Sequence, residues 1–291
     1  MGESKLKRLH AKEMPMSCAG VQTAGGRVQV RWDADGAATP MGQLAYFIEF
    51  LTLTGLWSGW QDRCPLAYTS PNAPGKADVL GTWMLSILSG HRRYSHVTTI
   101  RCDGVNPGLL GMNKVISEDA LRRALLAIPE EAGIGWLDGH LRESTAPLLD
   151  VPWILDIDTT IKPLYGKQEG AVVSYNPKKP GRPSHSYHTY LMAGLRLVMG
   201  VEVKAGNEHS GNHTLPGLLK LLDELPAAHK PKMVRGDCGF GSDGIMRELE
   251  ARAQPYLFKL RLSKNVKRHI ERLFRVSGWT DAGQGWEGID S

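Results

Sequence analysis

The stretch "ILDIDTT", residues 154–160, places Asp156 and Asp158 one residue apart at the end of an apolar run, directly before two threonines. Alternation of apolar and polar residues over so short a run is typical of a β-strand with one buried face. A carboxylate at the edge of a core is costly unless a cation, hydrogen bonds or a metal ion compensates its charge. The stretch therefore predicts a strand that delivers an acidic side chain to a site.

Downstream of this strand, apolar segments alternate between strand-like and helix-like patterns. We expect strands at 170–175, 190–206 with a bend at Gly200, 232–237 and 255–262, and amphipathic helices at 213–225 and 242–253, the latter capped by Ser242. In the last of these strands, Lys259 and Arg261 are expected to share one face. The order β-β-β-α-β-α-β predicts an α/β fold with a mixed sheet.

The first half of the chain has a pattern that predicts mainly helices. A hairpin around Gly25-Gly26 is expected in residues 18–33, and helices are expected at 41–56, 77–90, 117–128 and 130–144. Ser117 suits the N-cap of the third helix. We therefore divide the chain into a mainly helical N-terminal region, residues 1–145, and an α/β domain, residues 146–291.

Acidic residues follow two of the predicted strands at the point where each strand ends. Asp156 and Asp158 end the first strand, and Asp237 ends the strand at 232–237. Central strands of α/β sheets deliver the side chains at their carboxyl ends to the edge where sites are built, so Asp158 and Asp237 can meet. Two carboxylates brought together repel each other, and an oxygen-only ligand set suits Mg²⁺ or Mn²⁺. The pattern favours a divalent metal site used in phosphoryl transfer.

The positive charge of the chain is concentrated in its second half. The formal net charge is +5, and residues 255–275 contain seven basic residues and one acidic residue. A basic stripe is typical of a surface that binds the phosphate backbone of DNA, although it also describes an ordinary solvated face. The candidate DNA-binding residues are Arg92, Arg93, Arg122, Arg123, Lys259, Arg261 and Lys264.

The segments "DIDTT" and "VRGDCGFGSDGIMRELEARAQPYLFKLRLSKN" together resemble the DDE transposases of bacterial insertion sequences, of the IS4-like and especially the IS1380-like kind. The stretches at 206–225 and 110–125 are similar to further parts of that family, so the resemblance spans roughly residues 85–275. It implies an RNase H-like fold, with Asp158 as the first catalytic acid and Asp237 as the second. It also implies Mg²⁺-dependent attack of water, and then of a DNA 3′-hydroxyl, on phosphodiesters of double-stranded transposon ends and target DNA.

The resemblance also implies a third acid, a Glu on a helix well after the second Asp. Only 54 residues follow Asp237 in the 291-residue chain, and Glu271 lies too soon after the last strand to match. The final stretch, residues 277–291, is predicted to be a loop. The interpretation is a transposase that ends before its third acid, for which we expect little or no strand cleavage.

Three alternatives remain open at this point. The first is a haloacid-dehalogenase-type phosphatase, in which Asp156 is the nucleophile and Asp158 the acid. The second is a zinc site at His185, His188, His209 and His213, although no cysteine ligands accompany them. The third is a non-catalytic DNA-binding remnant.

Localisation and assembly are predicted from what the sequence contains. No apolar run reaches the roughly 18 residues of a membrane-spanning helix, and the charged N-terminus has no apolar signal region. We expect a cytoplasmic, nucleoid-associated bacterial protein without a membrane partner, which forms a homodimer on DNA.

Overall fold

The computed structural model describes residues 19–24, 26–30, 36–68, 70–176, 179–208 and 210–289. The chain divides into two compact units, one ending at Ile128 and one beginning at Pro129, with residues 63–65 belonging to the second. The sequence placed the boundary after residue 145, and the difference is one helix, which contacts a strand of the second unit. Gly25 and His209, used in the sequence analysis, lie outside the described residues.

The first unit begins with an antiparallel hairpin, which confirms the prediction for residues 18–33 as far as they are described. Its strands are β1 (Ala19–Thr23) and β2 (Gly26–Val30). The helices that follow are α1 (Leu44–Leu53), α2 (Leu56–Arg63), α3 (Lys76–Leu88), α4 (Val97–Ile100), α5 (Asn106–Leu109) and α6 (Glu118–Leu126). The mainly helical character of this region is therefore confirmed.

The helices of the first unit pack around a small apolar core and follow local sequence signals. Val79, Leu80 and Leu85 of α3 and Leu121 of α6 are fully buried. Ser117 caps α6 as predicted, because its hydroxyl accepts a hydrogen bond from the Ala120 N–H at 3.2 Å. The helix predicted at 41–56 is confirmed as α1, although it is shorter at both ends. Gly55 separates α1 from α2, and its φ of +70° is a left-handed conformation that glycine adopts without strain.

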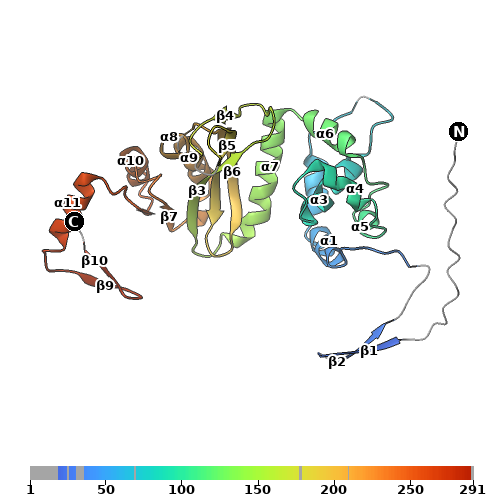
Figure 1. Ribbon diagram of the computed structural model, residues 1–291, viewed down its shortest axis with the longest axis horizontal. Helices are drawn as coiled ribbons and strands as arrows, with labels where there is room; N and C mark the ends of the chain where they lie inside the picture. The colour runs from blue at the N-terminus through green and yellow to red at the C-terminus, as the bar shows by residue number, and fades with distance from the viewer. Residues whose placement is uncertain are drawn as a thin grey trace. The chain divides into compact units, whose positions relative to one another are not determined.

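The second unit is built on a mixed sheet (Figure 1). Helix α7 (Glu130–Thr145) precedes the strands β3 (Ile154–Pro163), β4 (Val172–Val173), β5 (Pro183–Met192), β6 (Leu197–Ala205), β7 (Met233–Gly236) and β8 (Tyr256–Phe258). Strand β3 pairs antiparallel with β5 and parallel with β7, and β7 pairs parallel with β8. Strands β4 and β6 both pair antiparallel with β5. The predicted α/β fold with an RNase H-like mixed sheet is confirmed.

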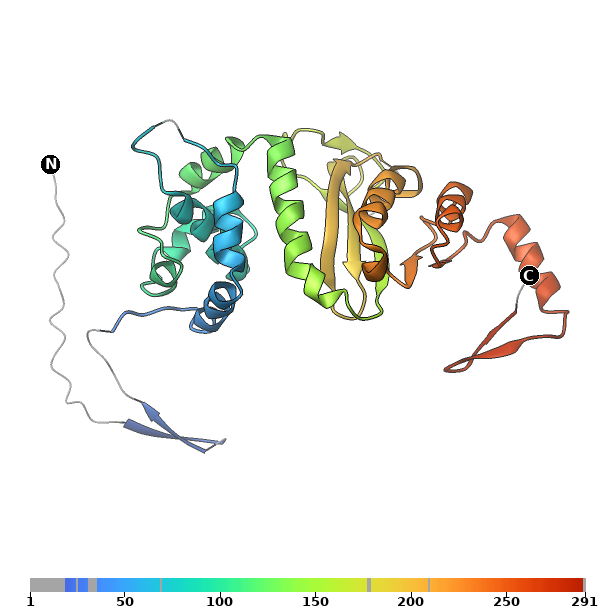
Figure 2. The ribbon, with the colours of Figure 1, turned by 180° about the vertical axis from the view of Figure 1, so that it is seen from behind.

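One face of this sheet forms the core of the unit. Helices α9 (Leu215–Glu224) and α10 (Asp243–Ala251), whose ribbons can be followed in Figure 2, lie on either side of β7 in sequence. Both contribute buried side chains to this core. The fully buried residues of the core include Leu155, Leu218, Val234, Ile245 and Leu249. A short helix, α8 (Ser210–His213), precedes α9. Ser242 occupies the N-cap position of α10 as predicted, but its side chain makes no capping hydrogen bond.

Three predictions about strands are wrong, each for a reason that depends on pairing. The strand predicted at 190–206 is two antiparallel strands, the end of β5 and all of β6, joined at Gly194 and Arg196, which both have positive φ. Strand β8 ends at Phe258, because its partner β7 ends at Gly236, so Lys259 and Arg261 lie beyond the strand.

The predicted C-terminal loop is the third correction. After α11 (Lys264–Leu273), the chain forms an antiparallel hairpin of β9 (Thr280–Gly283) and β10 (Trp286–Gly288). Its turn residues Gln284 and Gly285 both have positive φ, which is the geometry of a tight two-residue hairpin turn. Glutamine is uncommon at such a position, so the sequence carried no clear turn signal there.

Candidate active site

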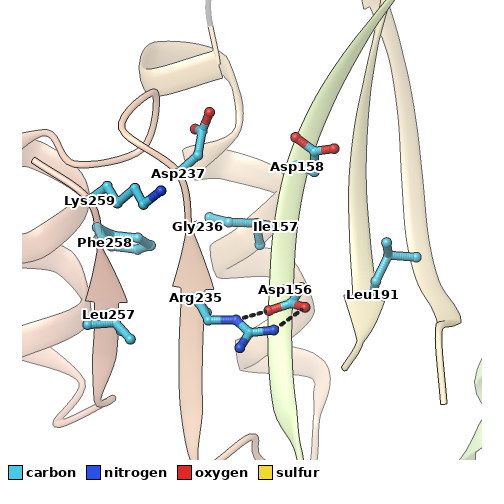
Figure 3. Close-up of a pocket in the computed structure, with 10 residues that line it drawn as sticks. All are labelled: Asp156, Ile157, Asp158, Leu191, Arg235, Gly236, Asp237, Leu257, Phe258 and Lys259. Carbon is cyan, nitrogen blue, oxygen red and sulfur yellow. Dashed lines mark hydrogen bonds and ion pairs between the residues drawn. The ribbon is translucent and has the colours of Figure 1, made fainter. Parts of the chain in front are cut away.

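The parallel pairing of β3 with β7 brings the two predicted acids together. Asp156 is level with Arg235 and Ile157 with Gly236, so Asp158 and Asp237 are the next residues at the same end of the sheet. The strands predicted at 154–160 and 232–237 are thus neighbours in the sheet, as the expected meeting of their acids requires. Figure 3 shows the Asp237 carboxylate just beyond the end of β7 and the Asp158 carboxylate on the neighbouring strand β3. Strand β3 continues past Asp158 to Pro163, so the prediction that Asp158 ends its strand is wrong.

An open cleft of about 550 Å³ lies at this end of the sheet. Its lining comes from four strands and the residues that follow them: Asp156, Ile157, Asp158, Leu191, Arg235, Gly236, Asp237, Leu257, Phe258 and Lys259. Asp158 is exposed, whereas Leu155 and Ile157 on the opposite face of β3 are buried. The strand therefore presents its acids to the cleft and packs Leu155 and Ile157 into the core, with Ile157 also bordering the cleft.

The turn after β7 sets the position of Asp237. One carboxylate oxygen, Oδ1, accepts a hydrogen bond from the Gly239 N–H at 2.8 Å, and the Asp237 carbonyl accepts one from the Phe240 N–H at 3.2 Å. A side chain at Gly236 has no space, because its Cβ would lie 2.9 Å from the Phe240 ring. The glycine-rich run after β7, residues 236–244, therefore begins with a tight turn that delivers Asp237.

Asp156 shares the face of Asp158, but its charge is already compensated. Both of its carboxylate oxygens accept hydrogen bonds of 2.7 Å from Arg235, the residue level with it on β7. The hydrogen bonds to Asp156 raise the pKa of Arg235 further above its already high ordinary value. The sequence analysis missed Arg235, and the available signal was a charged residue inside the apolar strand at 232–237. The pairing favours a supporting role for Asp156 and leaves Asp158 and Asp237 as the free acids.

The chemistry of these two carboxylates fits a hard divalent cation. Asp158 accepts a hydrogen bond on Oδ1 from the Thr159 N–H at 2.8 Å, so each acid has one oxygen engaged by backbone and the other available. Oxygen donors of this kind suit Mg²⁺ or Mn²⁺, which complete their coordination with water and substrate oxygens. Among the residues that the structure describes, no group of three or more potential metal ligands comes together. Glu271, exposed on α11, is not part of the cleft lining.

The candidate DNA-binding residues of the second unit separate into two sets. Lys259 lines the cleft together with the acids, whereas Arg261 and Lys264 are exposed and do not contribute to its lining. Lys264 is the first residue of α11, whose N-cap Ser263 accepts a hydrogen bond from the Val266 N–H.

The candidate DNA-binding residues of the first unit are all exposed. Arg92 and Arg93 line a second, smaller cleft of about 190 Å³, together with Tyr94. The guanidinium of Arg122 lies 5.3 Å from the centre of the Tyr94 ring, which is a cation–π contact. Arg123 is exposed on the same helix as Arg122. The sequence analysis did not predict that Tyr94 lines this cleft with Arg92 and Arg93 and also contacts Arg122.

The histidine alternative receives no support from the described residues. His185 and His188 lie on β5, not in a loop, and their three-residue spacing points them to opposite faces of the strand. His188 is completely buried, where it hydrogen-bonds Ser186 and Thr214, and this burial lowers its pKa. His213 is exposed and lies 3.2 Å from Glu208.

Within the described part of the chain, no helix combines the length and apolar character needed to span a bilayer.

Several solved structures resemble this chain at low sequence identity. A piggyBac transposase synaptic complex with hairpin DNA shares 14% identity, with 85% of this chain and 48% of that chain covered and a TM-score of 0.33. The HTLV-2 integrase catalytic core domain in complex with magnesium shares 16% identity over 43% of this chain and 70% of that one, with a TM-score of 0.24. A Mos1 mariner paired end complex with Mn shares 12% identity over 82% of this chain and 91% of that one, with a TM-score of 0.26. The chain thus spans about half the length of the piggyBac transposase.

Sequence comparison supplies the assignment. No curated protein sequence matches the chain. The family model "Transposase DDE domain group 1" matches residues 83–283, more than half of the 291 residues, and this match sets aside the phosphatase alternative. The two acids of the cleft lie inside the matched segment. The chain belongs to the DDE transposase family, as a member of its DDE domain group 1.

Proposed function

We propose that the protein is the transposase of a bacterial insertion sequence of the IS4-like, IS1380-like kind, which cleaves and joins DNA strands by phosphoryl transfer. The observation that carries this proposal is that Asp158 and Asp237 line one cleft, Asp158 on β3 and Asp237 directly after β7, the parallel neighbour of β3. Family membership supports the same chemistry.

Mg²⁺ or Mn²⁺ is the cofactor that the free carboxylates suit. Asp158 and Asp237 would hold the ion, since one or two carboxylates with water are a common ligand set for Mg²⁺. When bound, such an ion supplies charge stabilisation at the phosphoryl group and lowers the pKa of an attacking water. The Thr159 and Gly239 N–H groups keep the two carboxylates oriented.

Double-stranded DNA is the proposed partner of both units. Arg92, Arg93 and Arg122 gather around Tyr94 in the first unit. Arg261 and Lys264 extend the basic surface beyond β8 in the second. Contacts of this kind to phosphates release counterions, so we expect binding to weaken steeply as salt rises. Replacing Lys259, Arg261 and Lys264 together by Ala should lower affinity for all DNA sequences and flatten the salt dependence.

The number of free acids in the cleft bears on the rate of cleavage. Among the described residues, the cleft presents Asp158 and Asp237, whereas Asp156 is held by Arg235. A two-metal mechanism needs further ligands to position a second ion, and losing one electrostatic stabiliser typically costs about 10²–10³ in rate. We therefore expect residues 1–291 alone to bind DNA and Mn²⁺ but to cleave DNA slowly or not at all.

The test compares the 291-residue chain with Asp158→Ala and Asp237→Ala on a plasmid that carries the ends of its element, in Mn²⁺. Weak metal-dependent DNA cleavage that both substitutions remove supports the proposal. Robust cleavage that both abolish supports the chemistry but contradicts the expected slow rate, and Glu271→Gln and Asp243→Asn would then identify another acid. DNA binding without cleavage, together with a Mn²⁺ affinity that neither substitution changes, would instead favour a non-catalytic DNA-binding protein.

A further inference from the structure

The acidic side chains of the cleft form two levels along the strands, and they differ in how their negative charge is compensated. On the lower level in Figure 3, Asp156 and Arg235 form a bidentate ion pair. On the upper level, Lys259 is the cation that the described lining places with Asp158 and Asp237. Lys259 is exposed and forms no ion pair with any residue that the structure describes. Its ammonium group is therefore available to a ligand.

The position of Lys259 beside the acids is set by its backbone. Its N–H donates to the Gly236 carbonyl at 3.4 Å, which continues the β7–β8 pairing for one residue. Its carbonyl packs against Gly241, where a Cβ would approach that oxygen to 2.7 Å, so only glycine allows this contact. The residues on both sides of Asp237 thus hold the backbone of Lys259, and Figure 3 shows its side chain extending toward β7.

We propose that Lys259 binds a non-bridging oxygen of the DNA phosphodiester that enters the cleft, and positions that phosphate over Asp158 and Asp237. This role rests on the proposed function. The physical reason is electrostatic: two carboxylates repel a phosphate, and an ammonium group with three donors at the rim attracts it. Arg261 and Lys264 belong to the same basic run but lie outside the cleft, so their contacts reach only phosphates away from the reacting one.

The first measurement uses Mn²⁺ alone with Lys259→Met, Lys259→Arg and Arg261→Met in the full 291-residue chain. A cleft ammonium repels a cation at the neighbouring carboxylates, so Lys259→Met should bind Mn²⁺ about three- to ten-fold more tightly by electron paramagnetic resonance titration. Lys259→Arg and the matched Arg261→Met should stay within about two-fold of the unsubstituted chain. Urea midpoints check that every variant is folded.

The second measurement uses a fluorescein-labelled DNA duplex, with Ca²⁺ in place of Mn²⁺ to prevent cleavage. Lys259→Met should weaken binding about five- to ten-fold in Ca²⁺ and less in a chelator, whereas Arg261→Met should weaken it equally in both. Lys259→Arg should restore the affinity in Ca²⁺.

Two results would overturn the inference: Lys259→Met behaving like Arg261→Met in both titrations, or tighter Mn²⁺ binding without weaker DNA binding. A failure of the proposed function looks different. In that case Asp158→Asn and Asp237→Asn leave Mn²⁺ affinity unchanged, whatever the substitution at Lys259 does.

Discussion

The two faces of strand β3 differ in what they contact, although their residues alternate along one chain. Leu155 and Ile157 are 0% and 3% exposed and pack into the core, whereas Asp156 and Asp158 line the open cleft. Because successive side chains of a strand point to opposite faces, ten residues serve both purposes. On this strand, neighbouring residues therefore have different purposes: the side chains of one face stabilise the fold, and those of the other face belong to the candidate active site.

Replacing a leucine on each face should give the largest contrast in stability. Leu155 is completely buried, so Leu155→Ala should lower the free energy of unfolding by about 2–5 kcal/mol, from lost burial and the cavity left behind. Leu191, which lines the cleft on the neighbouring strand, is only half-buried, and Leu191→Ala should cost about 1 kcal/mol or less. Urea denaturation measures both values. Equal losses would mean that the two faces are not distinct in the way described.

Tyr190, on the covered face, should give the next largest effect and a dependence on pH. It lies opposite Ile157, and its hydroxyl donates to the Glu202 carboxylate at 2.8 Å. Burial, assisted by Glu202, raises its pKa above the ordinary value of 10. Tyr190→Phe should therefore cost about 1.5–3 kcal/mol near neutral pH, as expected for a hydrogen bond to a charged group.

The direction of the pH effect follows from the raised pKa. The stabilisation by Tyr190 is complete below about pH 10 and declines as pH rises, because the unfolded chain loses its tyrosine proton first. Stability measured from pH 8 to pH 11 should fall more steeply for the unsubstituted chain than for Tyr190→Phe. Parallel curves would show that the hydroxyl is not buried as described.

The ion pair on the open face should give the smallest stability effect. Asp156 and Arg235 have side chains that are 31% and 48% exposed, so solvent screens their attraction. Asp156→Asn should change the free energy of unfolding by about 1 kcal/mol or less. Urea denaturation of this variant and of Leu155→Ala compares the two losses directly. A loss of the size expected for Leu155→Ala would show that this pair, and not the apolar face, stabilises β3.

Much of the fold of the second unit could be predicted from local patterns. The α/β order after Pro152, the adjacency of β3 and β7 and the delivery of Asp158 and Asp237 to one edge follow from periodicity and from the geometry of parallel strands. Both acids follow apolar runs, which made them visible in the sequence.

What could not be predicted depends on pairing between distant segments. The match of Asp156 with Arg235 requires the register of two strands 79 positions apart. The end of β8 is set by its partner, which is why Lys259 belongs to the cleft and not to a strand face. The division of 190–206 into two strands required left-handed residues at Gly194 and Arg196, and only the glycine is a usual signal.

The most direct test of the two-acid site is the affinity for Mn²⁺ of the 291-residue chain and three aspartate variants, measured by electron paramagnetic resonance titration. Asp158→Asn and Asp237→Asn each remove a proposed ligand and should weaken binding by at least about ten-fold. Asp156→Asn, a matched change in the same cleft, removes a charge that Arg235 already compensates and should weaken binding less than about three-fold. Unchanged affinity in Asp158→Asn or Asp237→Asn, or a loss confined to Asp156→Asn, would contradict the account.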